Sequence, residues 1–252
     1  MKHFLPALIT TFFIISAAYA KEHATDTSAK KILPPIQRFY IGGAADGAIF
    51  STATIKHTTL NGTASPDITN TYGTLRFSYI FNFGFSFNFN LNRHLGVYTG
   101  IDIKNIGFIE KNNGGETVKR RTYNIGAPIG IKIGNMAKKG NFLFLGGGVD
   151  APVNYREKTF SIRDQKIKFN EWFSERTPQI MPYIFAGVSI HRGITLKAQY
   201  YPGNFLNPNF TTHNTQPYAG FDVHLIMFSV GFATHYSKHH DIKKHVAELN
   251  TM

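Results

Sequence analysis

Cysteine is absent from the 252 residues, which excludes a disulfide-stapled domain, thiolate metal sites and cysteine nucleophiles. Acidic residues are also scarce, with 15 against 27 basic residues, so the formal net charge is +12. Beyond the first 20 residues, no stretch approaches the roughly 18 continuous apolar residues that a transmembrane helix requires. These absences exclude a small disulfide-bonded domain and, after the first 20 residues, a helical membrane protein.

The start of the chain has the features of an export signal. Lys2 and His3 give a positive beginning, residues 4–15 are mainly apolar, and residues 18–20 read Ala-Tyr-Ala. This order predicts a signal peptide cleaved before Lys21, because the apolar core is too brief for a membrane anchor of about 20 residues. An exported protein is not expected to bind nucleic acid. Its excess positive charge instead suits anionic lipid head groups and lipopolysaccharide phosphates.

Residues 77–91 alternate between large apolar side chains and small or polar ones. A period of two indicates a β-strand, and the run is longer than the 5–6 residues usual in globular proteins. Its polar positions are almost all small and uncharged, as expected for a crowded wet interior. The pattern is typical of a transmembrane barrel strand with its apolar face in lipid. The predicted lipid-facing residues are Phe77, Tyr79, Phe81, Phe83, Phe85, Phe87 and Phe89.

Seven further segments read as strands, and the connections between the eight segments alternate between long and short. The predicted strands lie near residues 38–50, 74–91, 95–109, 119–133, 141–156, 179–190, 194–203 and 220–235. Barrels of bacterial outer membranes have long extracellular loops and short periplasmic turns. We therefore expect an all-β fold, an eight-stranded antiparallel up-and-down transmembrane barrel in the bacterial outer membrane with both termini periplasmic.

This interpretation divides the chain into four parts. Residues 1–20 are the signal peptide, 21–37 a periplasmic N-terminal segment, 38–236 the barrel and 237–252 a basic periplasmic tail. In the first strand, Ile49 is expected on the lipid side. In the last strand, the apolar positions change phase between Met227 and Phe228, which indicates a bulge or a misread register.

Charged residues on the predicted inward faces nearly balance. An eight-stranded barrel is just wide enough for side chains to fill it, and an unpaired buried charge is costly. We therefore predict a lumen plugged by ion pairs, with an ion-conducting path as the alternative. The predicted plug comprises Asp46, Arg76, Asp102, Lys104, Lys132, Asp150, Lys197 and Asp222.

The export signal, the aromatic-rich alternating strands, the glycine-rich inward faces and the order of connections resemble the small outer-membrane β-barrels. The likeness is greatest to the PorT-like group of Bacteroidota, within the wider OmpA/OmpX-type class, and it covers nearly the whole mature chain. It is architectural and rests on no diagnostic motif. The resemblance implies an interaction component of an outer-membrane complex, and type IX secretion machinery is one candidate because such relatives include its components. Sixteen residues follow Tyr236, which departs from barrels that end on an aromatic residue.

Three function classes follow. We favour a non-enzymatic structural or interaction barrel whose partners are outer-membrane lipid, lipopolysaccharide and periplasmic or outer-membrane proteins. A narrow porin-like channel is the first alternative. The second is an enzyme that modifies lipid A, for which His213 and His224 near Asp222 and Ser229 are the candidates. No Ser–His–acid set has a spacing that forces one face, so we expect no catalytic residue, cofactor or metal.

Two surface features remain. The tail has apolar residues at helical spacing among basic ones, which suggests a docking helix, although a solvated end is the interpretation we favour. Its candidate residues are Ile242, Lys243, Lys244, Val246 and Leu249. Aromatic residues near strand ends or in loops are expected in part to form an interfacial girdle, among them Tyr123, Tyr155, Tyr200, Tyr201, Tyr218 and Trp172. The charged loop 157–178 is expected to contain a hairpin above the membrane.

Overall fold

A computed structural model describes residues 36–59, 67–111, 115–136, 140–161, 166–190 and 193–236. The predicted signal peptide, all but the last two residues of segment 21–37, and the tail residues Ile242, Lys243, Lys244, Val246 and Leu249 lie outside the described residues. Within the described part of the chain, no helix is long and apolar enough to cross a membrane.

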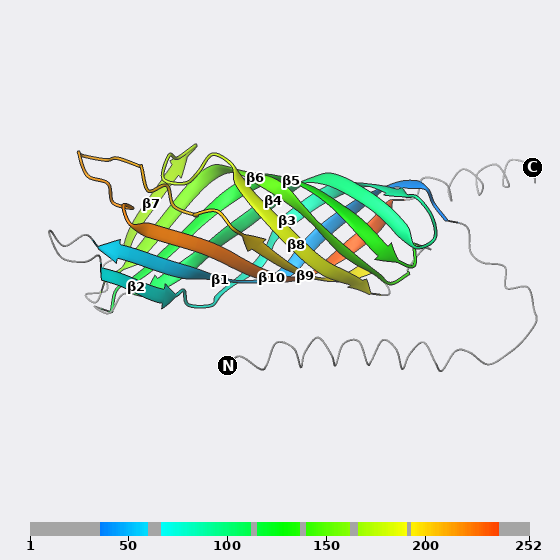
Figure 1. Ribbon diagram of the computed structural model, residues 1–252, viewed down its shortest axis with the longest axis horizontal. Coiled ribbons are helices and arrows are strands. Elements are labelled where there is room, and N and C mark those ends of the chain that lie inside the picture. Colours follow the sequence, from blue (N-terminus) through cyan, green and yellow to red (C-terminus); the bar gives the residue numbers. More distant parts are fainter. Residues whose placement is uncertain are drawn as a thin grey trace, which may run out of the picture. The chain divides into compact units, whose positions relative to one another are not determined.

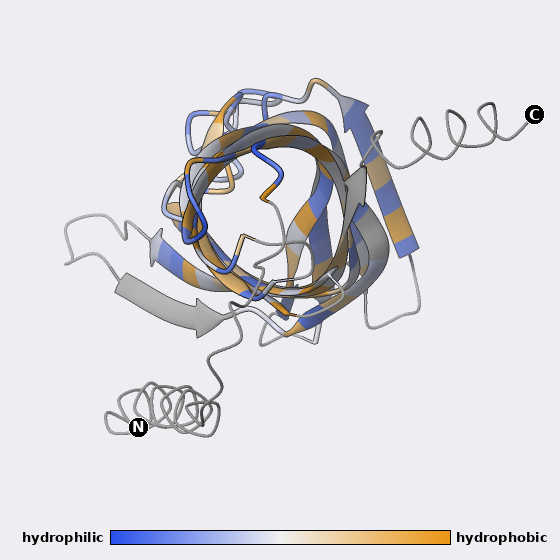
Figure 2. Cartoon of the chain, turned by 90° about the vertical axis from the view of Figure 1, so that its right-hand side faces the viewer, coloured by the Kyte–Doolittle hydropathy of each residue, from blue (hydrophilic) through white to orange (hydrophobic). Residues whose placement is uncertain are grey.

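The described residues form ten antiparallel strands, and eight of them close into a ring (Figures 1 and 2). Strand β1 pairs with both β3 and β10, so the ring runs β1-β3-β4-β5-β6-β8-β9-β10 and returns to β1. The predicted eight-stranded barrel is therefore confirmed. The strands are β1 (Phe39–Thr59), β2 (Asp67–Tyr72), β3 (Arg76–Asn90), β4 (Leu95–Lys111), β5 (Thr117–Gly134), β6 (Phe142–Phe160), β7 (Lys166–Trp172), β8 (Met181–Ile190), β9 (Ile194–Tyr201) and β10 (Phe221–Tyr236).

Strands β2 and β7 lie within predicted long connections. β2 pairs only with the end of β1, and β7 only with the end of β6. Each forms a hairpin with the end of its barrel strand. The pairing satisfies backbone N–H and C=O groups of that strand end which would otherwise need water as a partner. The hairpin expected in the loop 157–178 is thus β6–β7.

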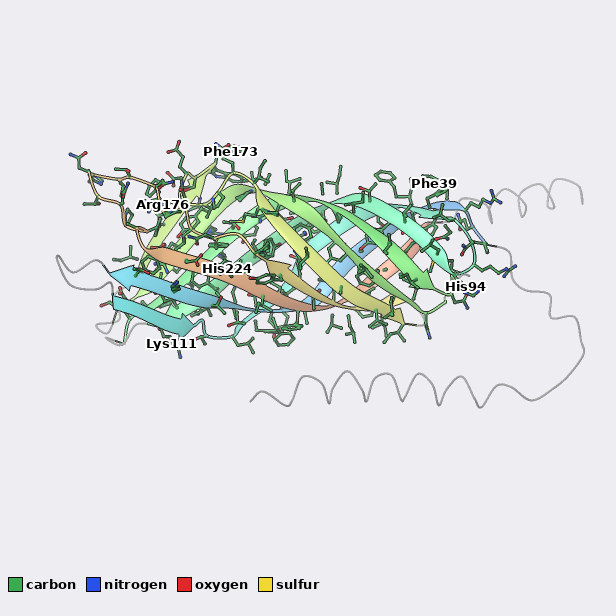
Figure 3. All side chains as sticks on the ribbon, in the orientation of Figure 1. Phe39, His94, Lys111, Phe173, Arg176 and His224 are labelled. Carbon is green, nitrogen blue, oxygen red and sulfur yellow. The ribbon has the colours of Figure 1, made fainter. Side chains whose placement is uncertain are left out.

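The two ends of the barrel differ in their connections. The links β3–β4, β5–β6 and β8–β9 are short and lie at one end, which we call the short-connection end. Pairing of Ile41 with Tyr236 shows that β1 begins and β10 finishes at this same end. Figure 3 shows Phe39 and His94 there, and Phe173 and Arg176 at the opposite, long-connection end.

Side-chain exposure along β3 follows the predicted alternation. Phe83 and Phe85 are 54% and 63% exposed, whereas Asn82 and Asn88 are each 5% exposed. Phe77, Tyr79, Phe87 and Phe89 also point out of the barrel and are exposed. The side chain of Phe81 lies outside the described residues. An outward band of this composition suits contact with lipid.

The phase of the alternation shifts in β1, where the sequence did not predict it. The register is irregular between Asp46 and Ala48 against both neighbouring strands. Asp46 faces inward, and Ile49, three residues later, also faces inward and is fully buried. The predicted lipid-facing position of Ile49 is therefore wrong. A bulge inserts one residue into the pairing and moves every later side chain to the other face.

Strand β10 carries no phase change. Val223, Leu225 and Met227 are buried inside the barrel, and Phe228 and Phe232 are exposed on its outer surface. The predicted break between Met227 and Phe228 is wrong because it assumed that every large apolar residue faces lipid. The half of the lumen near the long connections is itself apolar, so both faces of β10 carry apolar side chains.

Candidate functional site in the barrel lumen

A cluster of charges crosses the middle of the lumen. Lys104 of β4 places its Nζ 2.9 Å from Asp150 Oδ1 of β6 and 3.4 Å from Asp102 Oδ2. The ammonium also lies 3.6 Å from the centre of the Tyr183 ring, a cation–π contact. Tyr201 donates its hydroxyl to Asp150 Oδ2 at 2.6 Å. Every charge of this cluster is therefore paired or hydrogen-bonded, as burial requires.

Gly126 of β5 makes room for this cluster. In the sheet register, Gly126 lies between Asp102 of β4 and Asp150 of β6. A Cβ atom at this position would overlap the carboxylate oxygens of both aspartates. The missing side chain lets two carboxylates from strands on either side approach one lysine.

A second group of polar residues begins at Asp46. Lys197 Nζ lies 3.2 Å from Asp46 Oδ2, and Asn82 donates its amide to the same oxygen at 3.1 Å. The Oδ1 of Asn82 accepts the backbone N–H of Asn105, whose side chain in turn accepts a hydrogen bond from Arg76. Asp46 lies immediately before the bulge in β1, on the inward face of the strand.

The structure places the remaining predicted plug residues differently. Lys132 is buried nearer the short-connection end, where it donates to the Tyr40 hydroxyl and to the side-chain oxygens of Asn88 and Asn90. Arg76 is buried and bonds to Asn105. Asp222 does not belong to the lumen, so that prediction is wrong. Its carboxylate is 48% exposed and contacts His224 on the outer face of β10, because the inward positions there carry Val223 and Leu225.

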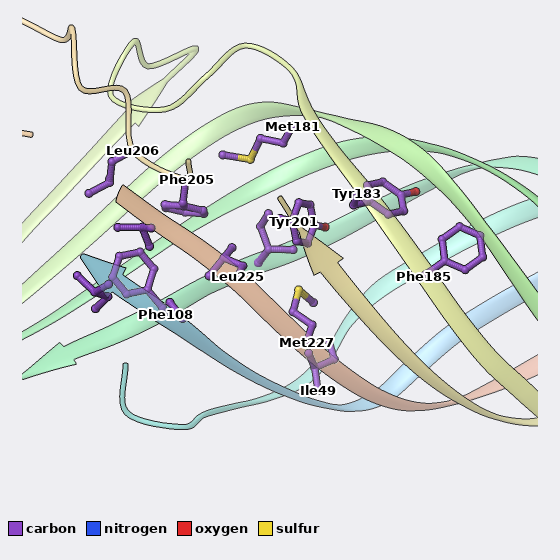
Figure 4. Close-up of a cluster of buried hydrophobic side chains, with 14 of the residues drawn as sticks. Ile49, Phe108, Met181, Tyr183, Phe185, Tyr201, Phe205, Leu206, Leu225 and Met227 are labelled. Atoms are coloured by element: carbon purple, nitrogen blue, oxygen red, sulfur yellow. The ribbon is translucent and has the colours of Figure 1, made fainter. Parts of the chain in front are cut away.

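An apolar cluster fills the lumen near the long-connection end, and sequence reasoning missed it (Figure 4). Phe205 and Leu206, from the connection between β9 and β10, are 2% and 0% exposed. Phe205 donates its backbone N–H to Val223 O, and its ring lies 5.4 Å from that of Phe108. The β9–β10 connection therefore folds back into the barrel mouth. In the sequence, the adjacent Phe205 and Leu206 within an otherwise polar connection could have indicated that this segment is buried.

Three aromatic residues expected to be candidates for the girdle belong to the interior instead. Tyr155, Tyr201 and Tyr218 are at most 4% exposed, whereas Tyr200 and Trp172 are 38% and 66% exposed.

A cavity of about 490 Å³ occupies the half of the lumen near the short connections. Its lining includes Tyr40, Asp46, Lys132, Ser189 and Lys197. The lumen thus contains a cavity at one end, ion pairs in the middle and an apolar closure at the other end.

The histidine candidates do not assemble a catalytic set. His224 faces outward with Asp222, whereas Ser229 is buried on the inward face of the same strand. His213 lies in the β9–β10 connection, is exposed and contacts Thr212. A nucleophile and its base must lie within hydrogen-bond reach, and alternation places His224 and Ser229 on opposite faces. Among the described residues, no group of three or more His, Asp or Glu side chains could hold a metal ion.

The chain belongs to the outer membrane protein beta-barrel domain family, whose model matches residues 47–232. Its location is therefore the bacterial outer membrane. No curated protein matches the chain significantly.

Three solved barrels are similar to the chain. The attachment invasion locus protein Ail of Yersinia pestis is 12% identical (TM-score 0.34), with 77% of this chain and 99% of that one covered. Neisserial surface protein A is 13% identical (TM-score 0.37), with 80% and 99% covered. The N-terminal β-barrel domain of Pseudomonas aeruginosa OprF is 9% identical (TM-score 0.24), with 75% and 99% covered.

Proposed function

We propose that this chain is a non-enzymatic outer-membrane barrel with a closed lumen that acts as a structural or interaction component of an outer-membrane or secretion-associated complex. The observation that carries the proposal is the double closure of the lumen. Phe205 and Leu206 fill the mouth at the long-connection end, and the ion pair of Lys104 with Asp150 lies below them. Both barriers lie along the lumen, and each of them opposes the passage of solutes.

The proposed orientation places the long connections outside the cell and both termini in the periplasm. The sorting of connection lengths supports this orientation, because outer-membrane barrels carry short turns on the periplasmic side. The resemblance to the PorT-like barrels of Bacteroidota adds a finer proposal, a role beside type IX secretion machinery. In that setting the tail 237–252 is available to a periplasmic partner.

Conductance across a planar bilayer tests the closed lumen. We expect the purified full chain to give no stable openings of nanosiemens size. Such openings would contradict the structural role and favour the alternative, a narrow channel. The observation that favours this alternative is the cavity of about 490 Å³ at the short-connection end.

Affinity purification in mild detergent tests the interaction role. The tagged full chain is compared with a variant that lacks residues 237–252, and recovered proteins are identified by mass spectrometry. Partners recovered by the full chain and lost by the variant would support docking through the tail. Identical partners would exclude the tail as the docking element, and no specific partner in either sample would contradict the interaction role.

A further inference from the structure

The hairpin β6–β7 and the end of β5 form a three-stranded sheet beyond the barrel ring, and its outward face carries only basic charge. The register places Lys119 beside Lys158 and Lys158 beside Lys168 in one row. The next row toward the barrel pairs Arg121 with Arg156. Paired residues of an antiparallel sheet point to the same side. We call the six residues of this surface the basic face: Lys119, Arg121, Arg156, Lys158, Lys166 and Lys168.

Alternation sorts the charges of this sheet by face. Glu157, between Arg156 and Lys158, points to the opposite side and contacts Arg120. Glu171 of β7 lies on that side too, 3.5 Å from Arg176. Glu157 and Glu171 are therefore held by other arginines on the inner side.

The cations of the basic face repel one another instead of being neutralised within the sheet. Lys158 is subject to repulsion from Arg121, Arg156, Lys166 and Lys168. Lys119 and Lys166 lie on the same aromatic ring, with their Nζ atoms 5.1 Å and 5.6 Å from the centre of Phe160. Such crowding is unfavourable unless an external anion lies among the side chains.

The position of this surface relative to lipid indicates which anion. Directly below the Arg121 row, the register aligns Tyr123, Asn154 and Trp172, and below that row Ile125 and Ala151 are exposed. Tyrosine and tryptophan are the residues that mark the membrane–water interface. A strand rises about 3.3 Å per residue, so the two basic rows lie roughly 7 and 13 Å beyond the aromatic row at most. The head-group layer is about 5–8 Å thick on each side of the bilayer, and tilt of the strands brings both rows closer to it.

We propose that the basic face binds the phosphate groups of lipid A in the outer leaflet. The proposal rests on the orientation given under Proposed function, since lipopolysaccharide occupies only the outer leaflet. Five of the six cations lie in these two rows, Lys166 lies one row further out beside Phe160, and the face is continuous with the lipid-facing surface. This cluster matches a glycolipid that carries two phosphates. Arginine and lysine both bind phosphate, arginine through a planar two-pronged contact.

Binding to lipid A in nanodiscs tests the proposal. The full chain is compared with the variant Lys158→Gln/Lys168→Gln, using diphosphoryl lipid A and monophosphoryl lipid A as probes. The matched control is Lys56→Gln, which removes an exposed base of β1 at the same end but outside the three-stranded sheet. Heat-dependent migration on gels checks that all variants are folded barrels.

We expect the Lys158/Lys168 variant to bind diphosphoryl lipid A at least about tenfold more weakly, and the control to change less than about twofold. Monophosphoryl lipid A should bind the unmodified chain more weakly than the diphosphoryl form. Equal losses in the two variants, equal affinity for the two lipids, or full displacement of lipid A by millimolar inorganic phosphate would overturn the proposal. So would displacement of lipid A by an acidic peptide.

A separate measurement distinguishes failure of the orientation from failure of the site. The chain has no cysteine, so Phe173→Cys, at a side chain 76% exposed, gives one thiol at the long-connection end. Labelling of intact cells by an impermeant maleimide reports this end outside the cell. Binding in nanodiscs does not depend on orientation, so lipid A binding without labelling would overturn the orientation and leave only the phosphate chemistry of the site.

Discussion

Lys104 of β4 and Asp150 of β6 meet across β5 inside the barrel, with 2.9 Å between Nζ and Oδ1 and side chains only 2% and 0% exposed. Because Asp102 lies 3.4 Å from the same ammonium, one lysine serves two carboxylates. The cluster links strands that do not pair directly. Substitutions in this cluster therefore test how far the buried ion pairs stabilise the ring of strands.

Replacing Lys104 with methionine should strongly destabilise the barrel. The substitution leaves the buried Asp150 and the half-buried Asp102 beside each other without their cation, and breaking a buried ion pair costs about 3–5 kcal/mol. Denaturant unfolding of the barrel in lipid vesicles measures the effect. Lys111→Met, at an exposed position of the same strand, is the control and should change stability by less than about 0.5 kcal/mol. Similar stabilities for the two variants would contradict the assigned role of Lys104.

Gly126→Ala tests whether the missing side chain is what allows the cluster to form. A methyl group there overlaps both carboxylates, so we expect overpacking to cost about 1–3 kcal/mol in the same unfolding assay. Gly203→Ala is the matched control, because a Cβ atom at Gly203 would have no neighbour within 4 Å. If Gly126→Ala were as stable as Gly203→Ala, the carboxylates would have to be held less tightly than the structure indicates.

A lysine at Phe85 should be far less tolerated than a lysine at the next residue, Ser86. Phe85 is 63% exposed on the outer surface, where a charge near the middle of the membrane costs about 2–4 kcal/mol. Ser86 lines the cavity inside the lumen, where an added ammonium does not enter lipid. Insertion efficiency and unfolding in vesicles provide the comparison. An equal effect at both positions would remove the distinction between lipid and lumen faces.

The corresponding substitution at Asn82 should also be harmful, although Asn82 faces inward. Its amide donates to Asp46 and its oxygen accepts from Asn105, so Asn82→Lys leaves the backbone N–H of Asn105 without its partner. We expect a loss of about 1–3 kcal/mol for an unsatisfied buried group. Ser86→Lys is the reference variant, and Asn82→Lys should unfold at lower denaturant concentration.

Opening the apolar closure should raise the permeability of the barrel. Phe205→Ala/Leu206→Ala removes two buried side chains at the barrel mouth, and we expect it to raise the frequency of small conductance steps in planar bilayers. Phe173→Ala, at an exposed position of the same end, should behave as the unmodified chain does. A silent Phe205/Leu206 variant would show that the ion pairs alone close the lumen.

The sequence by itself determined the number of strands in the ring, their antiparallel order, the long and short connections and the lipid-facing row on β3. A period of two fixes which residues share a face, and turn residues bound each strand, so these features are local. The same reasoning brought Asp46, Asp102, Lys104, Asp150 and Lys197 inward, but it could not pair them, because pairs such as Lys197 with Asp46 are 151 residues apart.

Tertiary structure alone decided four things. Alternation leaves the phase open wherever both faces are apolar, so only the closed ring showed that Val223 and Leu225 point inward and that Asp222 does not. The bulge after Asp46 is a property of how β1 pairs with two neighbours, and it reversed the expected side of Ile49. The inward fold of Phe205 and Leu206 and the joining of β5, β6 and β7 into one basic face depend on contacts distant in sequence, which a local pattern does not encode.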